Sequence, residues 1–266
     1  MYTAVFGLRC LPFTGAPASD RLFTCPDLDE VHSRLQYLVE HRAIGLLTGE
    51  PGSGKSTALR RLRDAVHPEQ IRILYLHDTV VSPRDFCCQI ALDLGLEPLW
   101  SRAQTLRAIH QEIRRLDTER RLTVLLVVDE AQGLRPDVLA LLPVLTSFEW
   151  DGAGRLALLL AGQTGLRQKL RMAHLEPLAQ RVTVRSTLRG LDRETTAAYL
   201  AHRLEQAGVS RPLLTETAIE ALFTASQGIM RRIDTLAHHA LALAATQGAK
   251  RVEAEHVVHA AEEVRA

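Results

Sequence analysis

The chain of 266 residues holds only four cysteines, no long hydrophobic run and almost no net charge. The cysteines form neither a Cys-x-x-Cys pair nor a histidine-spaced cluster, so the sequence gives no indication of a zinc site or a disulfide framework. No apolar run approaches the roughly 18 residues of a membrane-spanning helix, and the N-terminus lacks the basic start and apolar middle of a signal peptide. We therefore expect a cytoplasmic protein with no membrane partner.

Lysine is also scarce, because it occurs only at positions 55, 169 and 250 and all other basic residues are arginines. The formal charge of +1 does not by itself indicate a nucleic-acid-binding protein. Planar guanidinium groups suit phosphate recognition, but a high arginine content also reflects genome base composition. The arginines are spread over the whole chain, which favours the second explanation.

The most informative stretch runs from Gly49 to Thr57, after the apolar run Ile44–Leu47 and before a helix-like continuation at 58–62. Strand, glycine-rich loop and helix are the context that a P-loop needs. Its glycines let backbone N–H groups approach phosphate oxygens, and the helix N-terminus attracts the same charge. A glycine-rich turn that binds nothing is the alternative, and the completely filled pattern argues against it. We predict that ATP is bound by Gly49, Glu50, Pro51, Gly52, Ser53, Gly54, Lys55, Ser56 and Thr57, with Lys55 on the β- and γ-phosphates and Ser56 on Mg²⁺.

A second stretch is the apolar run from Arg121 to Val128, which ends in Asp129 and Glu130. Because it is apolar at successive positions, we expect a strand buried on both faces at the centre of a parallel sheet. The two carboxylates then lie at the edge where ligands bind in open α/β sheets. Asp129 is the candidate for holding Mg²⁺ and Glu130 for polarising the attacking water. The alternative, an acidic helix cap, is weakened by the P-loop upstream.

The remaining pattern predicts an α/β core followed by helices. Besides the P-loop elements, we expect strands at 71–76, 121–130, 156–163 and 181–185, and helices at 27–42 (capped by Asp27), 83–94 and 103–116. Further helices are expected at 194–206, 215–224, 230–245 and 253–264. The predicted organisation is an α/β nucleotide-binding domain over 1–190 and a helical lid domain over 191–266.

The first 26 residues have the composition of a loop and carry Phe6, Phe13 and Phe23. A segment in this position can wrap the adenine base, which makes Phe13 a candidate nucleotide contact. Its aromatic side chains can equally fill the core. The sequence does not separate these two alternatives.

The P-loop, the Asp-Glu pair, a polar residue at the tip of the fourth strand, an arginine before the fifth and a helical lid together resemble an AAA+ ATPase. Shorter blocks resemble one subgroup, which includes secretion-pathway ATPases of the ExeA/GspA type and transposition regulators of the TnsC and MuB kind, the latter being closest in organisation. These blocks are Phe6-Gly7-Leu8 with Pro12-Phe13, Asp129-Glu130-Ala131-Gln132, Leu145–Glu149, Ala161-Gly162-Gln163 and Leu178-Ala179-Gln180-Arg181. The resemblance covers essentially the whole chain.

The resemblance implies roles for two residues of the core. Gln163 lies in the sensor-1 place, where many relatives have asparagine. Arg181 matches the arginine finger that enters the neighbouring subunit's site and stabilises transition-state charge. The alternative for Arg181 is a surface arginine at the start of a strand.

In the lid, the stretch 228–234 resembles the sensor-2 block, which implies an arginine on the γ-phosphate. Met230 stands where the family usually has proline, which leaves open whether Arg231 or Arg232 takes that role. We assign it to Arg231.

The transposition regulators grasp duplex DNA from segments after the second strand, which implies that Arg84, Ser101 and Arg102 contact DNA here. From its residues alone, the basic helix 103–116 either contacts a polyanion or presents a solvated face. The function so implied is an ATP-dependent, sequence-nonspecific DNA-binding ATPase that forms a ring or filament on DNA and activates a transposase, with or without a target-selector protein. The alternative is a secretion-pathway assembly ATPase that does not bind DNA.

Overall fold

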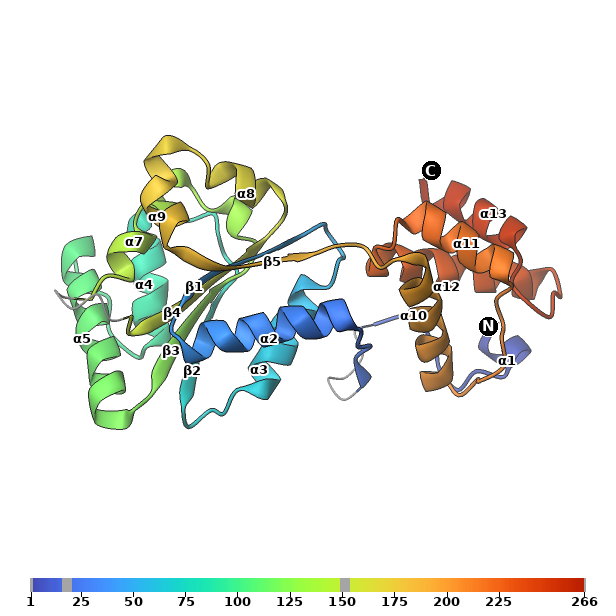
Figure 1. Cartoon of the computed structure of the whole chain (residues 1–266), viewed down its shortest axis with the longest axis horizontal. Helices are drawn as coiled ribbons and strands as arrows, with labels where there is room; N and C mark the ends of the chain where they lie inside the picture. The colour runs from blue at the N-terminus through green and yellow to red at the C-terminus, as the bar shows by residue number, and fades with distance from the viewer. Residues whose placement is uncertain (1, 16–20, 149–153, 266) are drawn as a thin grey trace. The chain divides into compact units, whose positions relative to one another are not determined.

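The structure is a computed structural model that describes residues 2–15, 21–148 and 154–265, so Glu149 of the Leu145–Glu149 block lies outside the described residues. The described residues divide into two compact units, whose elements are drawn in Figure 1. The α/β unit comprises Pro26–Gly49 and Lys55–Leu188. The helical unit comprises the chain from Arg189 onward, the segment up to Cys25 and the short stretch Glu50–Gly54.

The α/β unit is built on a five-stranded sheet in which all neighbouring strands are parallel. The strands are β1 (Ile44–Gly49), β2 (Ile71–Leu76), β3 (Thr123–Val128), β4 (Leu156–Gly162) and β5 (Val182–Leu188), in the order β2-β3-β4-β1-β5. The register places Val128 beside Leu76 and Leu160, and Thr48 beside Gly162. The carboxyl ends of four strands therefore meet at one edge, and the predicted α/β fold with a parallel sheet is confirmed.

The position of β3 differs from the prediction, because β4 is the middle strand. β4 is buried at all seven of its positions and β3 at five of its six. Because β3 and β4 are both covered on both faces, an apolar run alone does not indicate which of them is the middle strand of the sheet.

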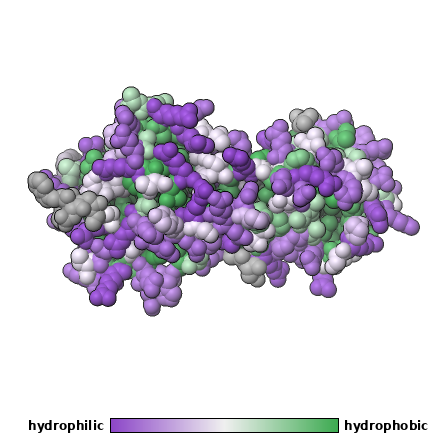
Figure 2. All heavy atoms as spheres, viewed as in Figure 1, coloured by the Kyte–Doolittle hydropathy of each residue, from purple (hydrophilic) through white to green (hydrophobic). Residues whose placement is uncertain are grey.

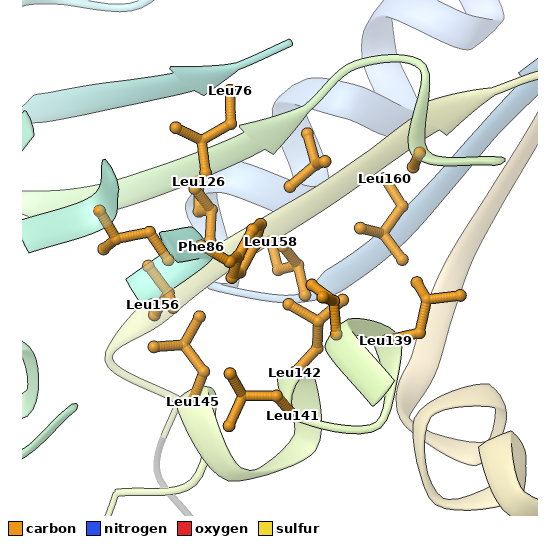
Figure 3. Packing of buried hydrophobic residues seen from close by; sticks show 14 of the residues in the cluster. Leu76, Phe86, Leu126, Leu139, Leu141, Leu142, Leu145, Leu156, Leu158 and Leu160 are labelled. Carbon is orange, nitrogen blue, oxygen red and sulfur yellow. The ribbon is translucent and has the colours of Figure 1, made fainter. Parts of the chain in front are cut away.

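Helices cover both faces of the sheet, and alternate residues of the inner strands point to opposite sides. These helices are α2 (Pro26–Glu40), α3 (Lys55–Ala65), α4 (Pro83–Asp93), α5 (Arg102–Arg120), and the shorter α6 (Pro136–Leu139), α7 (Leu142–Leu145), α8 (Gly165–Lys169) and α9 (Glu176–Arg181). Residues of α2 and α3 form one cluster with Leu125 of β3, whereas α4 and α5 form another with Leu126. Figure 3 shows Phe86 of α4 beside Leu126 and Leu158 in the second cluster.

Helix boundaries follow local capping. The Ser101 hydroxyl accepts the N–H of Gln104 at 3.1 Å and starts α5, which ends only where Arg121 takes a left-handed φ of 53°. α5 is therefore longer than the predicted 103–116. Asp27 is not the cap of α2 but lies in its first turn, because the helix begins at Pro26, whose fixed φ suits a first helical position.

The short helices α6 to α9 are missing from the sequence-based prediction. Each has four to six residues, so none completes the two turns over which apolar periodicity shows. Arg181 is the last residue of α9, and β5 covers Val182–Leu188 rather than 181–185.

The helical unit contains α10 (Arg193–Gln206), α11 (Glu216–Ser226), α12 (Met230–Thr246) and α13 (Ala254–Arg265), close to the predicted ranges. It also contains α1 (Tyr2–Phe6), in a segment that was predicted to be a loop. Tyr2 is buried in the core of this unit, and its hydroxyl lies 2.9 Å from Nδ1 of His238 on α12. Contact with α12 thus orders a helix too short to be stable alone.

The first 25 residues contribute to the helical unit, although the sequence placed them in the nucleotide-binding domain. Phe13 is 4% exposed in the hydrophobic cluster of this unit, which also buries Phe6. Nε of Arg203 donates to the carbonyl of Pro12 at 2.7 Å. The buried positions of Phe6 and Phe13 correspond to the alternative in which these side chains fill the core.

Among the described residues, no helix is both long enough and apolar enough to cross a membrane. On the face drawn in Figure 2, hydrophilic residues cover most of the surface and hydrophobic residues lie scattered between them.

Candidate nucleotide-binding site

The P-loop lysine lies at the junction of β1 and α3. Lys55 is the first residue of α3 and is 6% exposed, and its Nζ donates to the carbonyl of Gly49 at 3.0 Å. Ser56 is exposed at the same helix start. A buried ammonium and a hydroxyl thus stand at the N-terminus of an eleven-residue helix, where phosphate oxygens are favoured.

The loop itself, Glu50–Gly54, packs in the helical unit against the start of α12. Gly52 and Gly54 have φ of 83° and 100°. A Cβ at Gly52 would lie 2.5 Å from Cβ of Arg231, and one at Gly54 would lie 2.6 Å from Cε of Met230. The two glycines are therefore required both by backbone conformation and by close packing.

Arg231 is the sensor-2 candidate that touches this loop. Its backbone N–H donates to the carbonyl of Gly52 at 3.2 Å, and its side chain is exposed, as is that of Arg232. The backbone of Arg231 thus contacts the P-loop, and the sensor-2 role of its side chain stays a prediction.

Asp129 follows β3 and is 5% exposed. Its Oδ2 accepts the hydroxyl of Tyr75 at 2.7 Å, and its Oδ1 accepts the N–H of Glu130 at 2.9 Å. Burial, together with the Asp129 hydrogen bond and the charges of Asp129 and Glu130, raises the pKa of Tyr75 to about 12. Tyr75 therefore remains a hydrogen-bond donor to Asp129 at neutral pH.

Tyr75 was not predicted from the sequence. The available signal is that it is the one aromatic residue in the strand Ile71–Leu76, one position before its end. The register places it opposite Val127, so its ring reaches the carboxyl edge beside Asp129.

Glu130 is exposed and takes a left-handed backbone conformation, with φ of 51° and ψ of 35°. It opens a 3₁₀ turn, Ala131–Gly133, and its Oε2 accepts Nε2 of Gln132. The predicted base is therefore exposed to solvent, and the predicted metal ligand beside it is buried.

Gln163 directly follows β4, and its backbone N–H donates to Oε1 of Gln132 at 3.0 Å. Arg181 lies at the end of α9 and is exposed. Its guanidinium donates to the carbonyl of Pro143 and to the hydroxyl of Ser147, both at 2.7 Å. Within the α/β unit, Arg181 is therefore held against the end of α7.

The predicted DNA-contacting residues share one surface at the starts of α4 and α5. The guanidinium carbon of Arg84 lies 5.8 Å from the ring centroid of Trp100, which is 89% exposed. Ser101 caps α5, and Arg102 is its exposed first residue. Val80, 87% exposed, lies in the segment that follows β2.

A parallel sheet with a P-loop after its first strand and an Asp-Glu pair after its third defines the class of P-loop nucleoside triphosphatases. A family described as "AAA domain" matches residues 38–170, which is half of the chain. The chain belongs to this family and is an AAA+ ATPase.

One curated relative is general secretion pathway protein A of Aeromonas hydrophila, which is 34% identical over 258 residues. The match covers 95% of this chain and 46% of the relative, so the chain spans about half the length of that protein.

Similar solved structures include Cdc6p of Pyrobaculum aerophilum, with a TM-score of 0.71, 20% identity and coverage of 95% of this chain and 70% of that one. The Aeropyrum pernix ORC1 protein in complex with DNA has a TM-score of 0.64, 20% identity and coverage of 92% and 67%. The Aeropyrum pernix ORC2 protein, in ADPNP-ADP complexes, has a TM-score of 0.64, 16% identity and coverage of 95% and 71%. These likenesses establish the AAA+ fold.

Proposed function

We propose that the chain couples ATP binding and hydrolysis to assembly on duplex DNA. The observation that carries the hydrolytic part is the tip of β3, where buried Asp129 stands beside exposed Glu130 in a parallel sheet whose first strand leads to Lys55. The DNA part rests on the Arg84, Trp100 and Arg102 surface and on the fold shared with an ORC1 protein that was solved with DNA.

The donor set fits Mg²⁺. No group of three or more His, Cys, Asp or Glu side chains forms a metal cluster in the described part of the chain. Mg²⁺ commonly takes one or two protein oxygens together with substrate phosphates and water. Ser56 and Asp129 supply such hard oxygens, and the ion would neutralise charge on the β- and γ-phosphates.

The other residues act on the reaction directly. Lys55 binds the β- and γ-phosphates, and Glu130 accepts the proton of the attacking water. Arg231 contacts the γ-phosphate from the lid. Arg181 stabilises transition-state charge in the site of a neighbouring copy, for which it must leave Pro143 and Ser147.

The proposal of DNA binding is supported by the arginines at the starts of α4 and α5. The guanidinium groups of Arg84 and Arg102 suit phosphate oxygens, so contacts should be insensitive to sequence and weaken steeply with salt. The exposed ring of Trp100 adds a stacking or apolar contact with DNA. The resemblance to transposition regulators makes a transposase a candidate partner of the DNA-bound assembly.

A second candidate function is supported by the secretion-pathway relative, which matches 95% of this chain. In that case the same ATPase drives an assembly of proteins, and the surface around Trp100 contacts a protein instead of DNA. DNA binding distinguishes the two candidates.

The hydrolytic part is tested by Glu130→Gln. We expect ATP affinity within about threefold of wild type and a fall in kcat of about 100-fold or more, because a general base contributes 10²–10⁴-fold. Lys55→Ala is the comparison, since it should lose ATP binding as well. Hydrolysis by Glu130→Gln at the wild-type rate would show that Glu130 is not the base.

A further inference from the structure

We propose that Gln132 is a positioning residue for ATP hydrolysis, which holds the carboxylate of Glu130 and ties it to the main chain at the tip of β4. The inference rests on the assignment of Glu130 as the catalytic base. In the sequence, Gln132 is the last residue of the Asp129-Glu130-Ala131-Gln132 block and has no assigned role; the structure shows its hydrogen-bond partners.

The side chain of Gln132 uses both ends of its amide. Nε2 donates to Oε2 of Glu130, and Oε1 accepts the backbone N–H of Gln163 at 3.0 Å. One partner is an acceptor and the other a donor, so an amide satisfies both at once, whereas an ionised carboxylate could serve only Gln163. Gln132 therefore bridges the residue after β3 that carries the base and the residue after β4 that occupies the sensor-1 place.

The surroundings hold Gln132 in this position. A Cβ added to Gly162 would lie 2.5 Å from Oε1 of Gln132, so the last residue of β4 has to be glycine for the bridge to fit. Nζ of Lys169 on α8 donates to the carbonyl of Gln132 at 2.9 Å and also to that of Leu134. Lys169 thus fixes the backbone of the turn, and the end of β4 packs against the side chain of Gln132.

Glu130 needs such support. It is exposed, and its backbone has a left-handed φ of 51° at the end of the strand. An exposed glutamate with no partner samples several rotamers, and a misplacement of about 1 Å at a reacting centre costs on the order of 100-fold in rate. The bond from Gln132 engages one carboxylate oxygen, and the carboxylate keeps further acceptor capacity for the attacking water.

Two variants test the bridge. Gln132→Glu keeps the length of the side chain and the acceptor for Gln163 but removes the donor to Glu130, whereas Gln132→Met removes both. We expect each to lower kcat about tenfold or more while KM for ATP stays within about twofold. Gln168→Ala, which truncates an exposed glutamine on α8, is the matched control and should change neither constant.

The decisive measurement repeats Gln132→Met in the Glu130→Gln background, by single-turnover hydrolysis with the protein in excess over ATP. With no base to position, the additional loss should be below about twofold. An equal fractional loss in both backgrounds, or a rise in KM with kcat unchanged, would overturn the inference. Normal hydrolysis by Glu130→Gln alone would instead refute the catalytic base, so the two failures are distinguishable.

Discussion

At the scale of single residues, the tip of β3 is organised by side chains that the motif does not include. Tyr75 donates to Asp129 from the neighbouring strand, and Gln132 donates to Glu130 from the following turn. Each carboxylate of the Asp-Glu pair therefore has its own polar partner. Such partners fix the orientation of a ligand or base and tune its strength.

Tyr75→Phe tests the partner of Asp129. Loss of the hydroxyl should raise the Mg²⁺ concentration for half-maximal hydrolysis about tenfold, as is typical when a hydrogen bond to a metal ligand is removed. Because the pKa of Tyr75 is raised to about 12, the hydroxyl stays protonated, and the effect should be the same at pH 6.5 and pH 8.5. Tyr37→Phe, at an exposed position on α2, is the control. An unchanged Mg²⁺ dependence would show that Tyr75 does not support the metal ligand.

At the scale of elements, the helical unit contains a buried polar network that joins α10, α12 and the N-terminal segment. Arg203 is 5% exposed, donates to the carbonyl of Pro12, and lies 3.5 Å from Oδ2 of Asp234. The Tyr199 hydroxyl donates to Oδ1 of Asp234 at 2.8 Å. Burial raises the pKa of Asp234 to about 6, although Arg203 and the Tyr199 hydrogen bond oppose the shift.

This shift predicts a pH dependence. Between about pH 4 and pH 6 the native state holds a proton on Asp234 that the unfolded chain has lost, so the free energy of unfolding falls as pH rises through that window. The expected contribution is on the order of 1–3 kcal/mol. Asp234→Asn keeps an acceptor for Tyr199 but cannot titrate, so it should remove this pH-dependent contribution.

Calorimetric melting of wild type and Asp234→Asn at pH 4.5 and pH 6.5 measures the contribution of Asp234. It is the difference between the two proteins in how stability changes with pH. The comparison cancels the titration of other carboxylates. A variant with the same pH dependence as the wild type would contradict the shift.

The long elements could be predicted from the sequence, whereas the order of strands could not. Strand 71–76 and helix 83–94 carry strong local signals, namely an apolar run and a Ser-Pro start. That β4 and not β3 occupies the middle of the sheet depends on pairing between distant segments. The burial of Phe13 with α10 and α12 likewise has no local signal, because a loop with aromatic residues packs on whichever surface covers it.

The residues of the candidate site likewise include some that the sequence predicts and some that it does not. Lys55, Asp129 and Glu130 could be named from the sequence because their spacing to glycines and apolar runs is itself the signal. The partners of Tyr75 and Gln132 could not be predicted, since they are set by the register of β2 beside β3 and by the 3₁₀ turn Ala131–Gly133. The hydrogen bond from the Arg181 guanidinium to α7 could not be predicted either, because α7 itself has too few residues to predict.

At the scale of the whole molecule, the two candidate functions differ in whether ATP controls binding to duplex DNA. In the proposed function, Arg84, Trp100 and Arg102 would supply the contact surface, and nucleotide bound at the P-loop would control it. A protein-assembly ATPase would use the same catalytic residues without any affinity for DNA.

The most direct test is the affinity for a random-sequence duplex with a slowly hydrolysed ATP analogue, with ADP and without nucleotide. We expect binding with the analogue that is at least about tenfold tighter than with ADP and that falls steeply with salt. Paired replacement of Arg84 and Trp100 by alanine should weaken this binding, and Arg251→Ala, at an exposed arginine of the helical unit, should not. Absence of DNA binding at low salt, with the analogue still bound, would contradict the claim and leave the protein-assembly ATPase.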